Sequence, residues 1–399
     1  MKIIGISGSY GKTTVAYLLH SYLDSINKSN NVYSSLDYEV AVPNNDRLNE
    51  ILKDAKEKDV EYLILEINEE YVDKIDTNVF DYKVLTNVSV IGELNEFDDY
   101  KSKLLSFYDN NSINIICYSP EIEKEKYLEF INKLNNKILF GSSYETEQYN
   151  IDKNLFYSLI FNNNQAIDDI NGIKFYILSE EKKLKIESKM MFDYSAYNIN
   201  CLYTIINTLK LYQEDTFFKT IENPIIPGRC EKIIYKGRTI LITLTIVDIL
   251  EYLDNYKKQG SINDIILVIG SIGVGHNTWN DEFNSKEQEE RLKRARKYAM
   301  EYSSDYCDYI YLTSSDPASS DPYKIANEME LYLINNHFFK TKIEVDRYSA
   351  IKNAIINSNV GDVIIISGRG NRKKYIKENK EYSFSDFELI QKAIKELGK

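Results

Sequence analysis

The chain of 399 residues has few of the residues that build disulfides and metal centres. Its cysteines form no CxxC pair, which favours reduced, buried thiols over disulfides or a zinc site. They are Cys117, Cys201, Cys230 and Cys307. The sequence holds three histidines, so a catalytic triad or a histidine-rich metal centre has little material.

Long apolar runs and an excess of positive charge are also missing. A membrane-spanning helix needs about 20 consecutive apolar residues, and no run in the sequence approaches that length. The first expected strand begins at Lys2, so we expect no signal peptide. The formal net charge is −12, which gives a nucleic-acid backbone little attraction. We therefore expect a cytoplasmic protein with neither a membrane nor a nucleic-acid partner.

A glycine-rich motif stands near the start of the chain. The stretch GISGSYGKTT (5–14) follows a strand-like apolar run and precedes an amphipathic helical pattern. Glycines let backbone N–H groups approach an anion, a lysine reaches the outer phosphates, and a threonine hydroxyl can hold Mg²⁺. The alternative is a strand–helix turn with an incidental lysine. The motif predicts a phosphate cradle made by Gly8, Gly11, Lys12, Thr13 and Thr14.

Apolar runs typical of buried strands alternate with helical patterns in the first half. This alternation predicts an α/β fold with a doubly wound, mostly parallel sheet. The expected strands are 61–68, 81–89, 113–119 and 136–142, and the expected helices are 45–57, 97–108 and 196–212. Short strands between turns near 150–190 predict an antiparallel insertion.

The proline-containing stretch ENPIIPGRCEKI (222–233) predicts a domain boundary, with a P-loop central domain at 1–225 and a second domain at 226–399. The second domain alternates again, which predicts a smaller Rossmann-like α/β fold. Its expected strands are 264–273, 308–316 and 362–370, and its expected helices are 285–303, 323–335 and 347–357. Ligands in such sheets bind beyond the carboxyl ends of the strands.

Several segments, in order along the chain, resemble the Mur ligases, most closely the MurE branch, which adds the third residue of the peptidoglycan stem peptide. GSYGKTT is similar to that family's GTNGKTT, and PGRCE (227–231) is similar to its PGRME. Further similar blocks are LEIN (65–68), LTNV (85–88), YNINCLYTII (197–206), TSSDPASSDP (313–322), DRYSAI (346–351) and SGRGNR (367–372).

The resemblance implies ATP and Mg²⁺ as cofactors and assigns roles to matching residues. Lys12 and Arg229 would counter the phosphate charge, and Thr13 and Glu66 would hold Mg²⁺. Asn87 lies in a nucleotide-binding block, and Asn200 matches the residue that contacts adenine. The implied catalytic residues are Lys12, Glu66 and Arg229.

The resemblance also implies a second-substrate site. Its residues are Asp316, Ala318, Arg347, Gly368, Arg369 and Gly370. Asp316 could accept from an ammonium group, and Arg369 could bind a carboxylate through two hydrogen bonds. These two charges predict a zwitterionic amine, such as an amino acid or a peptide N-terminus.

The departures from the family are informative as well. The P-loop begins almost at Met1, so we expect the family's UDP-sugar-binding domain to be absent and the acid substrate to carry no UDP group. An Asp-His pair of the family is replaced by Gly92 and Glu93. Glu93 is expected either to replace that histidine as a metal ligand or to be a surface residue. Ala318 stands where diaminopimelate-adding enzymes have an arginine.

Two functions follow from this comparison. The first is an ATP-dependent ligase that activates a small-molecule acid as an acyl phosphate and joins it to an amino-acid-like amine. Such catalysis depends on positioning and charge stabilisation. The second is a catalytically degenerate Mur-like nucleotide-binding subunit or regulator. The lost motifs favour the subunit. The enzyme is favoured by the retained family residues, which are Lys12, Thr13, Glu66, Asn200 and Arg229.

Overall fold

The computed structural model of the chain consists of two compact units, Met1–Pro224 and Ile225–Lys399. It describes residues 1–36, 40–88, 101–118, 124–148, 156–161, 167–179, 182–275, 285–377 and 380–398. The sequence-based boundary stood after residue 225, and the assignment of a different substrate to each unit remains a prediction. Within the described residues, no helix is long and apolar enough to cross a membrane.

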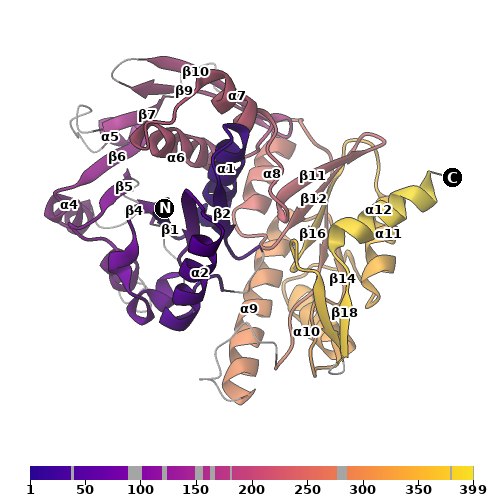
Figure 1. Cartoon of the computed structure of the whole chain (residues 1–399). Helices are drawn as coiled ribbons and strands as arrows, with labels where there is room; N and C mark the ends of the chain where they lie inside the picture. The colour runs from indigo at the N-terminus through magenta and orange to yellow at the C-terminus, as the bar shows by residue number, and fades with distance from the viewer. Residues whose placement is uncertain are drawn as a thin grey trace. The chain divides into compact units, whose positions relative to one another are not determined.

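The first unit is a sheet with helices packed on it (Figure 1). Its strands are β1 (Lys2–Ser7), β2 (Asn30–Tyr33), β3 (Tyr62–Glu66), β4 (Tyr82–Leu85), β5 (Ile113–Tyr118), β6 (Lys137–Ser142), β7 (Phe156–Phe161), β8 (Ile167–Asp169), β9 (Gly172–Ser179) and β10 (Lys183–Ser188). Its helices are α1 (Lys12–Ser25), α2 (Asn45–Glu57), α4 (Lys124–Lys133), α5 (Ser143–Gln148), α6 (Tyr194–Thr208) and α7 (Glu214–Glu222), with short 3₁₀ helices η1 (Glu69–Lys74) and η2 (Thr77–Val79).

The strand order of this sheet is β10-β9-β7-β6-β5-β4-β1-β3-β2. The strands from β2 through to β7 pair in parallel, while β7, β9 and β10 pair antiparallel, as do β8 and β9. The segment expected as an antiparallel insertion therefore extends the same sheet at one edge. Because β1 lies between β3 and β4, the carboxyl ends of these three strands meet beside the glycine-rich loop.

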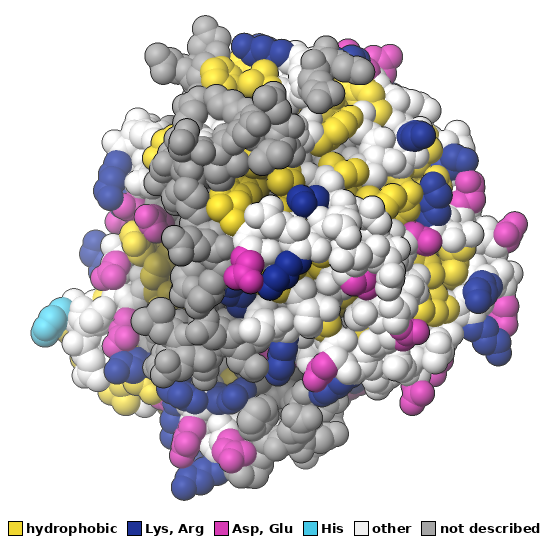
Figure 2. Space-filling view, turned by 90° about the vertical axis from the view of Figure 1, so that its left-hand side faces the viewer, with side chains coloured by type: hydrophobic (Ala, Val, Ile, Leu, Met, Phe, Trp, Pro, Cys, Tyr) yellow, Lys and Arg dark blue, Asp and Glu magenta, His cyan; other side chains and the backbone are white. Residues whose placement is uncertain are grey.

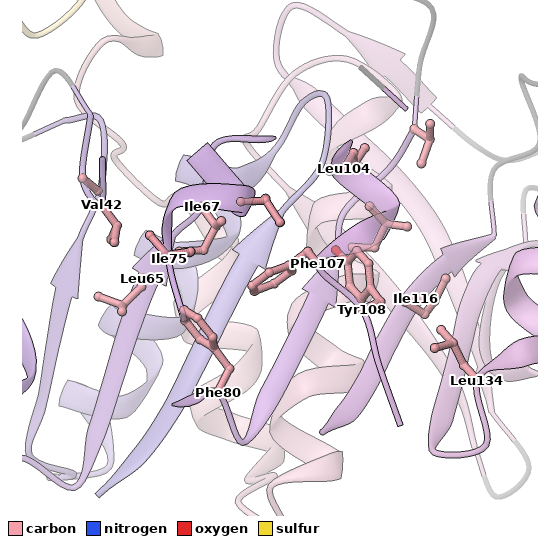
Figure 3. Packing of buried hydrophobic residues seen from close by; sticks show 14 of the residues in the cluster. Val42, Leu65, Ile67, Ile75, Phe80, Leu104, Phe107, Tyr108, Ile116 and Leu134 are labelled. Atoms are coloured by element: carbon pink, nitrogen blue, oxygen red, sulfur yellow. The ribbon is translucent and has the colours of Figure 1, made fainter. Parts of the chain in front are cut away.

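A large apolar cluster packs against this sheet (Figure 3). Phe80 and Phe107 meet edge to face, with ring centroids 5.1 Å apart. A Cβ on Gly5 of β1 would lie 2.6 Å from Phe107 and 2.7 Å from Phe80. Gly5 is thus a packing glycine that lets the two rings approach the central strand, and it lies before the loop proper. Helices α1 and α6 also pack against each other.

The second unit has a six-stranded sheet in the order β11-β12-β16-β13-β14-β15. Its strands pair in parallel except for β11 with β12. They are β11 (Arg229–Tyr235), β12 (Arg238–Thr243), β13 (Ile265–Ile269), β14 (Tyr309–Leu312), β15 (Thr341–Ile343) and β16 (Val363–Ser367), and β17 (Lys374–Lys377) and β18 (Lys380–Ser383) form a separate hairpin. The helices are α8 (Ile249–Lys258), α9 (Ser285–Tyr306), α10 (Pro322–Asn335), α11 (Arg347–Asn357) and α12 (Asp386–Leu397).

The predicted α/β class with a mostly parallel sheet is confirmed. Helices α2 and α11 have the bounds that the sequence predicted. Within the expected helix 97–108, the described residues begin at 101, and those from 101 to 106 are helical. The expected strands 264–273, 308–316 and 362–370 end earlier, because the glycine- and serine-rich residues after β13, β14 and β16 form loops.

On the face shown in Figure 2, Lys and Arg side chains are interspersed with Asp and Glu.

Candidate functional site

The glycine-rich loop between β1 and α1 follows the central strand of the first sheet. Gly8 has φ 137° and Gly11 has φ 83°, both in the left-handed region. A Cβ on Gly8 would lie 2.2 Å from Thr86 Oγ1, and a Cβ on Gly11 would lie 2.3 Å from Asn198 Oδ1. Any larger residue would strain the backbone and displace these neighbours. The two glycines therefore let the loop curve tightly into α1.

The residues after β4 fasten this loop. The backbone N–H of Ser9 donates to the Asn87 carbonyl at 3.2 Å, and that of Tyr10 donates to Asn87 Oδ1 at 2.8 Å. Thr86 Oγ1 donates to the carbonyls of Ser7, at 3.2 Å, and Tyr10. Asn87, which the resemblance placed in the nucleotide site, thus contacts the loop and fixes its shape.

Lys12 begins α1 and turns back over the loop. Its Nζ donates to the Gly8 carbonyl at 2.6 Å and lies 3.9 Å from Glu69 Oε2. In P-loops this lysine meets the outer phosphates. The ammonium group therefore already lies at the loop. Glu69, which the sequence analysis did not select, lies beside it.

Three side-chain oxygens meet beside the loop. Thr13 Oγ1 donates to Glu66 Oε2 at 3.0 Å, Ser35 Oγ donates to the same carboxylate oxygen at 3.3 Å, and the two hydroxyls are 3.2 Å apart. Glu66 is 3% exposed and also accepts from the Ser35 N–H at 3.0 Å. A carboxylate with two hydroxyls supplies hard oxygen ligands of the kind that Mg²⁺ takes alongside phosphates and water. The residues present therefore fit that ion.

Ser35 was missed by the sequence analysis, although a signal existed. It follows β2, whose carboxyl end lies next to that of β3 because the two strands pair in parallel. Two consecutive serines at a strand end were not given a role. Glu93, the other expected metal ligand, lies outside the described residues, as does Gly92. In the part of the chain that is described, no group of three His, Cys, Asp or Glu residues could hold a metal ion.

The asparagine expected to contact adenine is hydrogen-bonded inside the first unit. Asn200 is 0% exposed, and its side chain donates to the Gly141 carbonyl at 3.2 Å and accepts from Ser158 Oγ at 2.7 Å. Asn198, two residues earlier on α6, lies against Gly11 instead. Residues two apart on a helix face different directions. Asn198 is therefore the asparagine of this block that reaches the glycine-rich loop.

In the second unit, Arg229 begins β11 next to a bulge. Gly228 has φ 67°, and a Cβ there would lie 2.3 Å from the backbone nitrogen of Asn371. Gly370 and Asn371 belong to the loop after β16. The PGRCE segment and the SGRGNR segment, far apart in the sequence, therefore touch backbone to backbone.

The loop after β14 carries two expected substrate residues, and both are buried. Asp316 is 2% exposed, and its Oδ1 accepts from the Ile376 N–H at 2.7 Å. Ala318 is 3% exposed with φ 49°, and its N–H donates to the Ile376 carbonyl at 3.0 Å. Both residues thus hold the β17–β18 hairpin against the strand ends.

The two expected arginines of this region surround one buried carboxylate at the start of α12. Arg347 donates to Asp386 through Nε at 2.6 Å and Nη2 at 2.7 Å, and Arg369 Nε lies 3.9 Å from Asp386 Oδ1. Asp386 and Arg369 are 0% exposed. Arg347 also donates to the carbonyl of Ser314, after β14, and to that of Ser367, the last residue of β16.

Arg369 is occupied by backbone carbonyls of its own unit. Its Nη atoms donate to Ser315, Arg372, Lys374 and Phe384 at distances from 2.9 to 3.3 Å. Burial, together with the neighbouring Arg347, lowers the pKa of Arg369 to about 10. No part of the Arg369 side chain reaches the surface in this structure, and its role toward a substrate carboxylate stays a prediction. Gly368 has φ 98° and Gly370 φ 58°, which lets the loop wrap around it.

The model of the Mur ligase middle domain matches residues 6–205, which is just over half of the chain and includes the glycine-rich loop after β1, Glu66 and most of α6. The chain belongs to the Mur ligase family. It is an ATP-dependent ligase that forms an amide bond, as this family does. The predicted family is confirmed, and the individual site residues and substrates remain predictions.

Relatives extend the likeness over the full chain. A UDP-N-acetylmuramoyl-L-alanyl-D-glutamate–2,6-diaminopimelate ligase of Prochlorococcus marinus is 24% identical, and the alignment covers 100% of this chain and 78% of that protein. The enzyme of the same name from Caldanaerobacter subterraneus is 23% identical over 100% of this chain and 79% of its own length.

Solved structures show the same fold. The MurF ligase of Thermotoga maritima, in complex with ADP, matches with a TM-score of 0.63 and 16% identity, covering 99% of this chain and 81% of that one. A bifunctional folylpolyglutamate synthase/dihydrofolate synthase of Yersinia pestis, complexed with AMPPNP and a Mn ion, gives 0.63 and 12% identity over 92% of this chain and 86% of that one.

Proposed function

We propose that this ligase binds ATP at the glycine-rich loop of its first unit and uses it to activate a carboxylic acid. The observation that carries the proposal is the meeting of Lys12 with Thr13, Ser35 and Glu66 beside one loop. A lysine and backbone N–H groups suit the phosphates. The adjacent carboxylate and hydroxyls suit a divalent ion.

Each of these residues has a proposed part. Lys12 neutralises the outer phosphates. Thr13, Ser35 and Glu66 would hold Mg²⁺, and the ion would lower the charge of the polyphosphate. Asn198, at Gly11, contacts the base or sugar side of the nucleotide in place of Asn200. Asn87 keeps the loop in shape through Ser9 and Tyr10.

The reaction follows from these parts. An oxygen of the acid attacks the γ-phosphorus, ADP leaves, and an acyl phosphate forms. The nitrogen of the amine then attacks the acyl carbon, inorganic phosphate leaves, and the amine loses a proton as the amide forms. The chain contributes positioning and charge stabilisation.

The substrates are proposed more coarsely. The amine is an amino acid or a similar molecule that binds at the strand-end loops of the second unit, where ligands of such sheets bind. We also propose that Arg229 serves the phosphates and that the enzyme works in the cytoplasm.

One assay tests the function as a whole. Purified protein, Mg·ATP and pooled amino acids are incubated with candidate acids, and phosphate release is measured together with the mass of the products. We expect release that depends on both an acid and an amine. Tight ATP binding without release under any combination would instead favour the degenerate subunit or regulator.

A further inference from the structure

The acidic side chain next to Lys12 has a local environment that needs explanation. Glu69 begins η1, three residues after Glu66. Its Oε2 lies 3.9 Å from Lys12 Nζ, and the two side chains are 16% and 14% exposed. This distance is too long for a hydrogen bond, and the hydrogen bond of Lys12 goes to the Gly8 carbonyl at 2.6 Å.

The contact leaves Glu69 poorly satisfied. Its Oε2 is buried, and no described residue donates a hydrogen bond to it. A buried carboxylate oxygen without a donor costs free energy. Lys12 is the cation that the structure pairs with it. Any ligand that draws Lys12 away therefore leaves Glu69 without this counter-charge.

ATP is such a ligand if it binds as proposed above, and this inference rests on that proposal. Lys12 would turn to the phosphates, and two carboxylates, Glu66 and Glu69, would then lie at one end of the polyphosphate. Free ATP carries its full negative charge, so both carboxylates repel it. A nucleotide that arrives with a divalent cation brings part of the missing positive charge with it.

We propose that Glu69 determines the form of nucleotide that this site accepts, by selecting metal-bound nucleotide over free nucleotide. Glu66 holds the ion, and Glu69 penalises binding without it. Glu69 is a specificity-determining residue in this scheme and touches neither the acid nor the amine. The chain offers a matched control in Glu70, the next residue of η1, whose side chain is exposed.

The test is calorimetric titration of the full chain with a non-hydrolysable ATP analogue, once with Mg²⁺ and once with a chelator. Wild type, Glu69→Gln and Glu70→Gln are compared. We expect Glu69→Gln to bind the metal-free analogue about tenfold more tightly than wild type, the effect of removing one partly buried like charge. Binding of the Mg²⁺ form should change by less than about threefold, and Glu70→Gln should match wild type in both conditions.

The outcomes separate the two proposals. If wild type binds no nucleotide in either condition, the proposed ATP site is wrong. If wild type binds the analogue and Glu69→Gln keeps the same ratio of Mg²⁺-bound to metal-free affinity, the role of Glu69 is wrong. Loss of Mg²⁺-form affinity in Glu69→Gln would also overturn it, because Glu69 would then be a ligand of the ion. Equal melting temperatures of the variants exclude a folding defect.

Discussion

The two units use their motif residues in different ways. In the first unit, glycines, short hydroxyls and one lysine line a loop whose polar atoms meet at the carboxyl ends of β1, β3 and β2. In the second unit, the motif arginines are buried, and their donors are used by carbonyls of the loops after β14 and β16. The first set is the one proposed to meet a ligand, whereas the second set holds loops in place through these hydrogen bonds.

This difference shows what a matching motif implies. A loop that binds phosphate acts through its backbone N–H groups. Glycines are therefore needed at the positions where the backbone must come close to the ligand. A loop beyond a parallel strand needs its own carbonyls satisfied, because buried backbone oxygens without donors are costly. Arg347 and Arg369 satisfy that need. Substitutions should therefore separate stability from nucleotide affinity according to the unit in which they lie.

The largest expected effect is on the stability of the second unit. Asp386→Ala leaves Arg347 and Arg369 without their shared carboxylate, and breaking a buried ion pair from one side costs about 3–5 kcal/mol. Urea unfolding should show this loss, while calorimetry should show unchanged ATP affinity. The control is Glu381→Ala, which breaks an exposed pair with Lys374 and should cost less than about 1 kcal/mol. Equal effects of the two variants would contradict the buried-cluster interpretation.

The second largest effect is on ATP affinity and is expected from a change in the first unit. Lys12→Ala should weaken ATP binding by about fiftyfold, corresponding to the loss of a charge-assisted hydrogen bond of roughly 2–3 kcal/mol. Its unfolding free energy should fall by no more than about 2 kcal/mol, since the side chain makes one hydrogen bond to Gly8 and one ion-pair contact with Glu69. Retained affinity in a titration would end the assignment of the phosphates to this loop.

The sequence predicted the class, the parallel order of elements and the P-loop because these depend on local patterns. The direction of each side chain was less predictable. Asn198 and Asn200 share one block, and the geometry of α6 alone decides which reaches Gly11. The burial of Arg369 depends on α12, the β17–β18 hairpin and the link between them, which contribute Asp386 and the carbonyls of Lys374 and Phe384. Neither element was predicted, so the arginine between two glycines was read as facing a ligand.

Asn198 and Asn200 on α6 allow effects on stability and on ATP affinity to be compared within one helix. Asn200→Ala would leave Ser158 and the Gly141 carbonyl with fewer partners, so we expect a loss of about 1–3 kcal/mol in unfolding free energy with little change in ATP affinity. Asn198→Ala should do the reverse, weakening ATP binding by about fivefold, near the net worth of one neutral hydrogen bond. Unfolding curves and calorimetry on both variants decide this, and a larger binding loss in Asn200→Ala would restore the original assignment.

The smallest effect concerns Glu231 of the PGRCE segment, where burial raises the pKa of the carboxyl and a hydrogen bond from the Gly228 N–H opposes that rise. A raised pKa in the folded protein means that folding favours the protonated acid. Its stabilising contribution is therefore complete below the unfolded pKa and is lost as the pH rises through the folded pKa.

Glu231→Gln removes the charge and keeps an acceptor for Gly228. At neutral pH the variant should be more stable than wild type, by less than about 1 kcal/mol, and this advantage should shrink as the pH is lowered. Thermal unfolding between neutral and mildly acidic pH measures the difference. A variant that is less stable at neutral pH would show that the carboxylate is needed in its charged form, and would contradict this prediction.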